Sequence, residues 1–345
     1  MNSHQITILG AGSWGTALAT VLDHNGHKVT LWMRSEQQKE AILKNQINSM
    51  YLPDILLSNS IFPETNARLA LNNADVVILA IPTQQVRSVL KKYKEYIPAS
   101  AFVVNVAKGI EKTTRLTISK IVEEELGERE FAVLSGPSHA EEVAMRLPTT
   151  LVAASSRRRM AEKAQNLFMN KYLRVYTNPD VIGVELAGAL KNVIAFGAGI
   201  ADGIGYGDNA KAALMTRGIT EMARLGNVMG ASLNTFAGLS GIGDLIVTCT
   251  SMHSRNRRAG ILVGQGKSME MALKEVGMVV EGVSTAQAVY ELAQQHHVDL
   301  PITSAIYKVL YEKQDVKDAV YNLMTRSKKN EMEEIVENKP IEWDS

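Results

Sequence analysis

Short apolar runs and segments of helical spacing alternate along the first half of the chain. The apolar runs predict strands at 5–9, 28–33, 74–81, 101–106, 131–134, 149–154 and 172–177. Helical periodicity lies between them, at 16–26, 35–47, 83–95, 114–126 and 157–169. Residues 48–64, which contain Pro53 and Pro63, are predicted to be irregular. Continuous apolar strands alternating with helices are typical of a parallel sheet covered on both faces, here of about eight strands.

Strand patterning stops near residue 178. Beyond it, the apolar positions predict helices at 179–202, 210–226, 232–238, 255–264, 268–275, 282–296, 302–312 and 315–323. We therefore expect an α/β fold: a Rossmann-like doubly wound sheet over residues 1–178, followed by an all-α domain over residues 179–326. Residues 327–345 are charged and aperiodic, and are predicted to form a loosely ordered acidic tail.

One predicted helix is apolar on nearly all faces. Asn178 is a good N-cap and Pro179 suits the first helical position. From residue 186 to residue 201 the only polar side chains are Lys191 and Asn192. Such a helix is normally buried, and burial lowers the pKa of a lysine toward the range of proton exchange. The alternative is that Lys191 extends its charge to the surface along its apolar stem.

The first strand runs directly into a glycine-rich turn and a helix. Gly10, Gly12 and Gly15 have the spacing of the dinucleotide fingerprint, and the strand–turn–helix context makes that pattern specific. Gly10 allows the tight turn, Gly12 admits a pyrophosphate, and Gly15 permits close helix packing. The amides of Ser13 and Trp14 would then face the phosphates at the helix N-terminus.

The end of the second strand bears on cofactor choice. NAD-preferring sites place an acidic residue about 20 residues past the fingerprint. This chain has Arg34 there, and arginine accepts a 2′-phosphate. NADP is therefore favoured, NAD is not excluded, and an exposed surface arginine is the alternative.

Two polar segments follow the carboxyl ends of later strands, where open α/β sheets bind ligands. Lys108 follows strand 101–106, and the loop 135–140 follows strand 131–134. Ser138 and Glu141 suggest a helix start in that loop. His139 is either a catalytic acid or an incidental loop histidine.

The helical half carries further candidates. Asp244 stands where a glycine-rich turn enters an apolar segment, either as a functional carboxylate or as an N-cap. Ser254 is a plausible cap, after which Arg255 and Asn256 open a helix in an arrangement that suits a phosphate monoester. Arg257 and Arg258 are interpreted as a solvated basic face. Glu281, beside Gly282, stands at another possible turn and cap.

Composition excludes several classes of protein. The 345 residues contain 37 Lys and Arg against 36 Asp and Glu, so no overall field favours nucleic acid or a membrane surface. Cys249 is the single cysteine, which rules out an intrachain disulfide and fits a reducing compartment. The N-terminal residues before the first strand do not have the pattern of a signal peptide, and we expect a cytoplasmic protein without stable membrane association. No metal site is expected.

Seven motifs together resemble the bacterial NAD(P)-dependent glycerol-3-phosphate dehydrogenases, over essentially the whole chain to about residue 325. They are GAGSWGTALA, NVAKG, SGPSHAEEV, ELAGALKNVIAFGAGIADG, SGIGDLIVTC, SRNRRAG and VVEGVSTA. The resemblance implies interconversion of sn-glycerol 3-phosphate and dihydroxyacetone phosphate, which supplies phospholipid synthesis. It also implies a homodimer.

The resemblance also implies residue roles. Lys191 is similar to the family's general base, and Lys108 and Asp244 to its catalytic partners. Substrate contacts carried over are Lys108, Gly136, Ser138, Lys191, Asn192, Asp244, Thr248, Ser254, Arg255 and Asn256. Cofactor contacts carried over are Ser13, Trp14, Arg34, Lys108, Ala140, Arg255, Val279 and Glu281, beside the fingerprint glycines. His139 and the acidic tail inherit no role.

Two other functions stay open on the sequence alone. One is a related dehydrogenase of a β-hydroxy acid or a sugar acid phosphate, against which the ALKN and SRN motifs argue. The other is a non-catalytic dinucleotide-sensing protein, which leaves a buried Lys191 without a purpose. Turnover of NADPH with dihydroxyacetone phosphate distinguishes all three.

Overall fold

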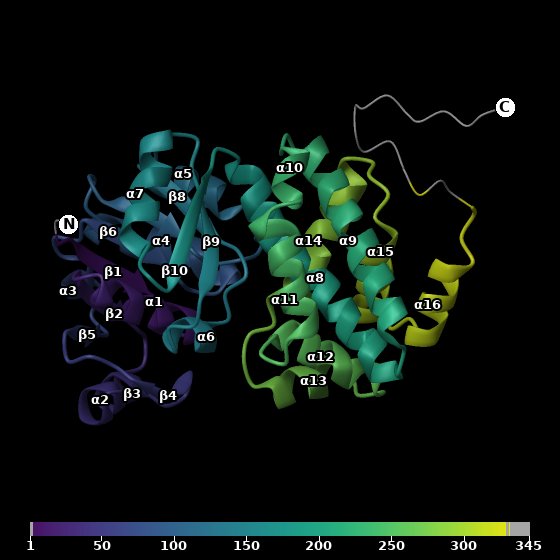
Figure 1. Cartoon of the computed structure of the whole chain (residues 1–345), viewed down its shortest axis with the longest axis horizontal. Helices are drawn as coiled ribbons and strands as arrows, with labels where there is room; N and C mark the ends of the chain where they lie inside the picture. The colour runs from purple at the N-terminus through teal and green to yellow at the C-terminus, as the bar shows by residue number, and fades with distance from the viewer. Residues whose placement is uncertain (1–2, 329–330, 332–345) are drawn as a thin grey trace.

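The computed structural model describes residues 3–328 and 331, and places the sheet and the helices in two adjoining halves (Figure 1). The sheet has eight strands in the order β10-β9-β8-β7-β6-β1-β2-β5. These are β1 (Gln5–Leu9), β2 (Lys28–Trp32), β5 (Ile61–Glu64), β6 (Val76–Leu79), β7 (Phe102–Asn105), β8 (Phe131–Ser135), β9 (Thr149–Ala154) and β10 (Leu173–Asn178). The expected Rossmann-like sheet followed by an all-α region is confirmed.

Helices cover both faces of the sheet because its central strands are apolar on both sides. In β6, Val76 and Ile78 belong to the core beneath one face, and Val77 and Leu79 to the core beneath the other. The surrounding helices are α1 (Ser13–His24), α2 (Glu36–Asn45), α3 (Ala67–Leu71), α4 (Thr83–Tyr93), α5 (Ile118–Leu126), α6 (Ala140–Ala144) and α7 (Arg158–Phe168). Strand β9 pairs antiparallel with β8, so β9 and β10 run against the other six strands.

The prediction that residues 48–64 are irregular is wrong in part. Strand β5 lies within this segment and pairs parallel with β2 at the edge of the sheet. An edge strand tolerates Pro63, since only one side of the strand joins the hydrogen-bond ladder. A small antiparallel pair, β3 (Ile47–Asn48) and β4 (Leu52–Leu56), lies before β5.

The helical half is built around α8 (Val181–Ile204), which Figure 1 shows at its centre. It also contains α9 (Asp208–Val228), α10 (Leu233–Phe236), a π-helical turn (Leu239–Gly243), α11 (Asp244–Thr250), α12 (Arg255–Gly264), α13 (Met269–Val276), α14 (Glu281–Gln295), α15 (Pro301–Tyr311) and α16 (Val316–Met324). Among the described residues, α8 is the one helix long and apolar enough to span a membrane, and 89% of its apolar window is buried inside the structure. It is therefore a core helix.

The start of α8 differs from the prediction. Asp180, rather than Asn178, is the N-cap, and its carboxylate accepts a hydrogen bond from the amide of Gly183 at 2.8 Å. Asn178 instead ends β10 beside Ala154, and its side chain accepts from the amide of Asp180. Strand pairing therefore continues to the residue where the sequence alone suggests that the helix begins.

Helices α8 and α12 touch backbone to backbone along a glycine seam, formed by Gly199 and Gly203 on α8 and Gly260 and Gly264 on α12. A Cβ atom at Gly199 would stand 2.1 Å from the carbonyl oxygen of Arg257, and one at Gly260 would stand 2.1 Å from that of Phe196. No other residue fits at such positions, so the seam fixes the spacing of the two helices.

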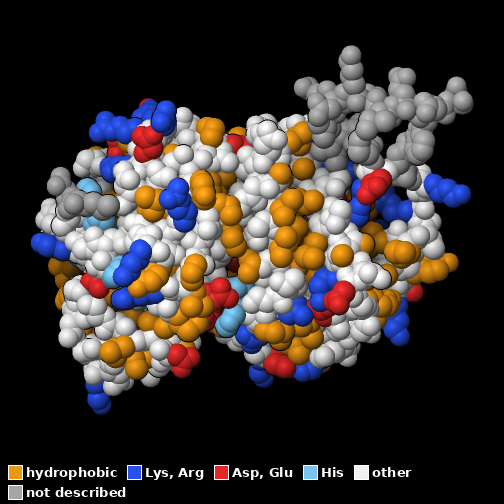
Figure 2. Space-filling model, viewed as in Figure 1, with side chains coloured by type: hydrophobic (Ala, Val, Ile, Leu, Met, Phe, Trp, Pro, Cys, Tyr) orange, Lys and Arg blue, Asp and Glu red, His pale blue; other side chains and the backbone are white. Residues whose placement is uncertain are grey.

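The face shown in Figure 2 carries basic and acidic side chains interspersed, without a field of one sign. The two halves meet at a notch at its lower edge, where histidine and acidic side chains gather. The predicted acidic tail, residues 327–345, lies outside the described residues except at 327, 328 and 331.

Candidate active site

The fingerprint turn lies between β1 and α1 and leaves room for a ligand over one glycine. Gly10 has a φ of +119°, and a Cβ there would stand 2.4 Å from the carbonyl oxygen of Ala80. A Cβ at Gly15 would stand 1.9 Å from the carbonyl oxygen of Gly10, whereas one at Gly12 would meet nothing within 4 Å. The turn is thus packed on two sides and open at Gly12, which fits a pyrophosphate at the N-terminus of α1.

The neighbouring polar groups fit the same use. The hydroxyl of Ser13 donates to the carbonyl of Tyr51 at 2.9 Å, and the buried indole nitrogen of Trp14 has no partner in the described part of the chain. Arg34 follows β2, is exposed, and makes no hydrogen bond or ion pair to any described residue. Its guanidinium is therefore available to a 2′-phosphate, and this role stays a prediction.

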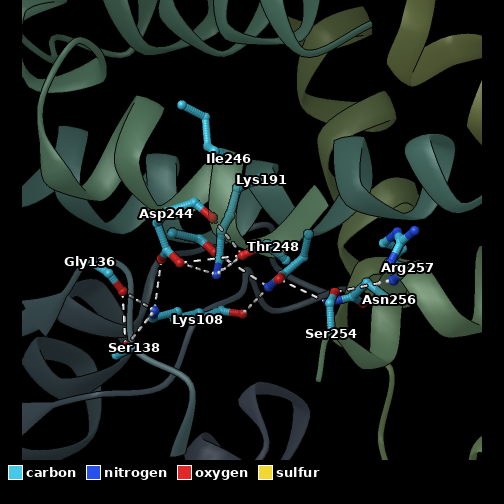
Figure 3. Close-up of polar contacts among 12 residues, drawn as sticks. Lys108, Gly136, Ser138, Lys191, Asp244, Ile246, Thr248, Ser254, Asn256 and Arg257 are labelled. Atoms are coloured by element: carbon cyan, nitrogen blue, oxygen red, sulfur yellow. Dashed lines mark hydrogen bonds and ion pairs between the residues drawn. The ribbon is translucent and has the colours of Figure 1, made fainter. Parts of the chain in front are cut away.

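Three charged side chains from distant parts of the chain meet at the centre of Figure 3. The carboxylate of Asp244 accepts from Lys191 Nζ at 2.5 Å and from Lys108 Nζ at 2.7 Å, with a different oxygen for each. Lys191 also donates to Thr248 Oγ1 at 2.8 Å. With 6% of its surface exposed, Lys191 does not extend to the solvent. Asp244 opens α11 but does not cap it, since its carboxylate is occupied by the two lysines.

The electrostatics prepare Lys191 to exchange a proton. Burial lowers its pKa to about 8, opposed by the negative charge of Asp244 and assisted by the positive charge of Lys108. Burial alone would raise the pKa of the Asp244 carboxyl, but the two lysines outweigh it and hold that pKa below its usual value. Asp244 therefore stays ionised, while Lys191 exchanges its proton near pH 8.

The loop after β8 presents backbone oxygen and hydroxyl groups to Lys108. Gly136 has a φ of +119°, and its carbonyl accepts from Lys108 Nζ at 2.8 Å. Ser138 Oγ lies 3.3 Å from the same ammonium and donates to the carbonyl of Gly136. Ser138 is therefore not the cap of α6, contrary to the prediction: His139 holds the N-cap position, without a side-chain bond.

A chain of amides joins three helices beside Lys191. Asn192 donates to the carbonyl of Lys108 at 3.2 Å and accepts from Asn256 at 2.9 Å. Asn256 in turn accepts from the amide of Gly282 at 2.8 Å. The structure thus uses the Asn256 side chain, predicted to hold phosphate, to link α8, α12 and α14.

The arginines at the start of α12 differ in their partners. Ser254 caps the helix by accepting from the amide of Arg257. Arg257 pairs with Asp202 at 2.7 Å and is mostly buried, so its interpretation as a solvated residue is wrong. Arg255 makes no hydrogen bond or ion pair with the residues that the structure describes. Burial lowers its pKa, against the charges of Glu281 and Glu141.

Glu281 reaches from the helical half to the sheet half. Its Oε1 accepts from the amide of Thr83, at the start of α4, at 3.0 Å. Its buried Oε2 has no hydrogen-bond partner among the described residues, and burial raises the pKa of the carboxyl. Ala140 is buried at the start of α6, and Val279 is 49% exposed just before α14.

The sequence interpretation missed three residues near the site. Thr83 and Tyr51 contact predicted cofactor residues, and only the position of Thr83 after a strand's carboxyl end was a usable signal. Glu185 on α8 is buried against the sheet half. Its signal was a carboxylate next to an apolar helical run. No group of three or more His, Cys, Asp or Glu side chains in the described ranges is placed to hold a metal ion.

The open fingerprint turn and the buried lysine define the class: a dinucleotide-dependent dehydrogenase with a helical second half. Comparison with known families identifies the particular one. The model described as the N-terminus of NAD-dependent glycerol-3-phosphate dehydrogenase matches residues 5–161, and that of its C-terminus matches residues 180–321. The chain belongs to this family.

Similar proteins agree over nearly the full length. Glycerol-3-phosphate dehydrogenase (NAD(P)+) of Bacillus velezensis is 53% identical, with 96% of this chain and 97% of that protein covered. The Bacillus cereus protein of the same name is 55% identical, with 96% and 98% covered. The crystal structure of glycerol-3-phosphate dehydrogenase from Coxiella burnetii is 38% identical with a TM-score of 0.91, covering 94% of this chain and 99% of that one.

Replacing Arg34 by Asp tests its predicted contact with the cofactor. We expect the affinity for NADPH to fall far more than that for NADH, because a 2′-phosphate would then meet a carboxylate in place of a guanidinium. Fluorescence titration of both cofactors measures the change, with Arg68→Asp on the exposed side of α3 as a control. Equal changes for the two cofactors would remove Arg34 from the ribose phosphate site.

Proposed function

We propose that this chain interconverts sn-glycerol 3-phosphate and dihydroxyacetone phosphate by hydride transfer with NAD or NADP, with Lys191 as its acid–base group. The product glycerol 3-phosphate serves phospholipid synthesis. The observation that carries the proposal is the buried Lys191 ammonium, held between Asp244 and Thr248 within the helical half. The test is nicotinamide absorbance in the presence of NADPH and dihydroxyacetone phosphate.

The chain's own residues supply proton transfer and positioning. In the oxidising direction, neutral Lys191 takes the proton from the C2 hydroxyl. A nicotinamide cofactor held at the fingerprint turn would supply the hydride acceptor. In the reducing direction, protonated Lys191 returns that proton to the developing alkoxide at C2. Asp244 holds the lysine in place through either step, and Lys108 adds positive charge beside the reacting oxygen.

Arg255 is proposed to bind the phosphate. Its guanidinium lacks a protein partner in the described chain and stands at the N-terminus of α12, whose amides favour an anion. Binding energy from the phosphate then positions C2, which is remote from it. A β-hydroxy acid has no phosphate for Arg255, and a dinucleotide sensor has no need of a titrating Lys191.

The division of labour follows the fold. We propose that residues 1–178 bind the dinucleotide, that residues 179–326 bind substrate, and that the enzyme works as a cytoplasmic homodimer without stable membrane association. The change from strands to helices between Asn178 and Val181 supports the boundary. Limited proteolysis and sedimentation test the boundary and the dimer.

Replacement of Lys191 by Ala is expected to lower kcat by about 10²–10⁴-fold, since general acid–base catalysis is usually worth that much. Affinity for NADPH should change little, because Lys191 lies outside the fingerprint turn. Stopped-flow turnover and cofactor titration measure the two effects. More than a tenth of the wild-type kcat in the variant would mean that another group moves the proton.

The pH dependence follows from the pKa of Lys191. Oxidation requires the neutral amine, so kcat/KM for glycerol 3-phosphate should rise as the pH increases through about 8, whereas reduction should decline over the same range. Replacing Asp244 by Asn removes a charge that raises this pKa, so the rise in oxidation and the decline in reduction should both move to lower pH. Initial rates across the pH range measure the two pH dependences. Unchanged pH dependences in Asp244→Asn would contradict the assignment of Lys191 as the titrating group.

Replacement of Arg255 by Ala tests the phosphate contact. We expect kcat/KM for dihydroxyacetone phosphate to fall at least tenfold, because each lost charge-assisted hydrogen bond costs about 1.5–3 kcal/mol. Trace activity on unphosphorylated dihydroxyacetone should barely change. Arg258→Ala, on the same helix, is the matched control and should remain close to wild type. A parallel loss on both substrates would place the phosphate site elsewhere.

A further inference from the structure

One face of α8 lies directly on the turn that carries Lys108. Glu185, Gly188 and Asn192 are three and four residues apart, so they line one face of the helix over about 10 Å. Lys191 stands on a different face, toward Asp244. The helix therefore holds the acid–base lysine on one side and contacts the Lys108 turn with the other.

Asn192 and Gly188 lie at the C-terminal end of this face. Asn192 donates to the carbonyl oxygen of Lys108 at 3.2 Å. At Gly188 an added Cβ would lie 3.0 Å from Ser135 Oγ and 3.6 Å from Lys108 Cγ, so the Lys108 side chain passes close over the helix backbone. The side chain of Lys108 then reaches Asp244 at 2.7 Å (Figure 3).

Glu185 lies at the N-terminal end of this face and is its one ionisable member. Its carboxylate accepts from the amide of Ser119 at 2.9 Å and from the Ser119 hydroxyl at 2.5 Å, at the N-terminus of α5. A third donor, Asn105 Nδ2, lies 3.5 Å from it. Asn105 in turn shapes the Lys108 turn, since its side chain accepts from the amide of Ala107 at 2.9 Å and donates to that residue's carbonyl.

We propose that Glu185 is a positioning residue for the reaction, which sets the Lys108 turn against α8 and so fixes the distance between Lys108, Asp244 and Lys191. The inference rests on the proposed function. Glu185 contacts neither the reacting atoms nor the predicted cofactor groups. It acts through Asn105 and α5, and it lies on the same face of α8 as Asn192, at the opposite end.

A second buried carboxylate in the chain separates this role from ordinary stabilisation. Glu221 on α9 accepts from the amides of Ile302 and Thr303, which makes it a cap for α15 inside the helical half. Burial raises the pKa of both Glu185 and Glu221 above the ordinary value. The two therefore match in burial and in capping a neighbouring helix, and differ in that only Glu185 reaches the turn of a catalytic residue.

The experiment compares Glu185→Ala with Glu221→Ala in the full-length enzyme, using dihydroxyacetone phosphate reduction, glycerol 3-phosphate oxidation and thermal unfolding. We expect both variants to unfold at lower temperature. Only Glu185→Ala should lose kcat, by at least tenfold, with KM for NADPH within threefold of wild type. Glu185→Gln keeps an oxygen acceptor for Ser119 and Asn105 and should retain kcat within threefold.

The pH profile supplies a readout that stability alone does not move. Lys191 is faced by Asp244, Thr248 and Cys249 on α11, by Lys108 after β7 and by His139 before α6. If the Lys108 turn withdraws in Glu185→Ala, Lys191 loses a repelling charge, and the rise in oxidation rate should move to higher pH than in the wild type.

Unchanged kcat and an unshifted profile in folded Glu185→Ala would overturn the inference, and so would equal losses of kcat in Glu185→Ala and Glu221→Ala. If Glu185→Asp is needed because Glu185→Ala does not fold, it decides by the same two criteria: the shorter side chain keeps a carboxyl group but falls short of Ser119 and Asn105. A wild-type chain inactive on both substrates would instead contradict the proposed function, and this is distinguishable because it appears before any variant is compared.

Discussion

The organisation of the site depends on one carboxylate between two ammonium groups. Asp244 receives Lys191 from the core helix of one half and Lys108 from a strand end of the other, with one oxygen for each. A buried charge of one sign is costly without a partner, and here a single anion serves two cations. Withdrawal of Asp244 would leave two buried ammonium groups facing each other without a counter-charge, so this carboxylate holds the two halves together at the reacting centre.

Helix α8 makes that arrangement possible because each of its faces serves a different neighbour. One face presents Lys191 to α11, a second lies on the Lys108 turn, and the glycine seam contacts α12. A helix exposed on one side has no such freedom, since some of its circumference faces water. Burial of α8 therefore lowers the pKa of Lys191 and also orients three functional segments around the helix.

Much of this architecture was predictable from local pattern, whereas the contacts between distant segments were not. The strands with continuous apolar runs and the fingerprint turn were predicted because their signals lie within a few residues. β5 was missed because Pro63 argues against a strand unless its edge position is known. Lys191 stands out as a lone cation in an apolar run. Its partner Asp244 lies 53 positions away and Lys108 lies 136 positions from Asp244, so the contact between the three could not be predicted from the sequence. Glu185 was passed over since nothing near it in sequence indicates Ser119 as its partner.

The glycine seam has a consequence for the size of molecule that the site accepts. Lys191 lies on α8 and Arg255 opens α12, and these helices meet through backbone atoms with no side chain between them. Side chains bend and change rotamer, but a backbone-to-backbone contact does neither. In the proposed function the seam thus fixes the separation of the two backbone segments from which the acid–base group Lys191 and the phosphate ligand Arg255 extend. A substrate of a different length would therefore be met by a change in the Lys191 and Arg255 side chains, and not by movement of α8 against α12.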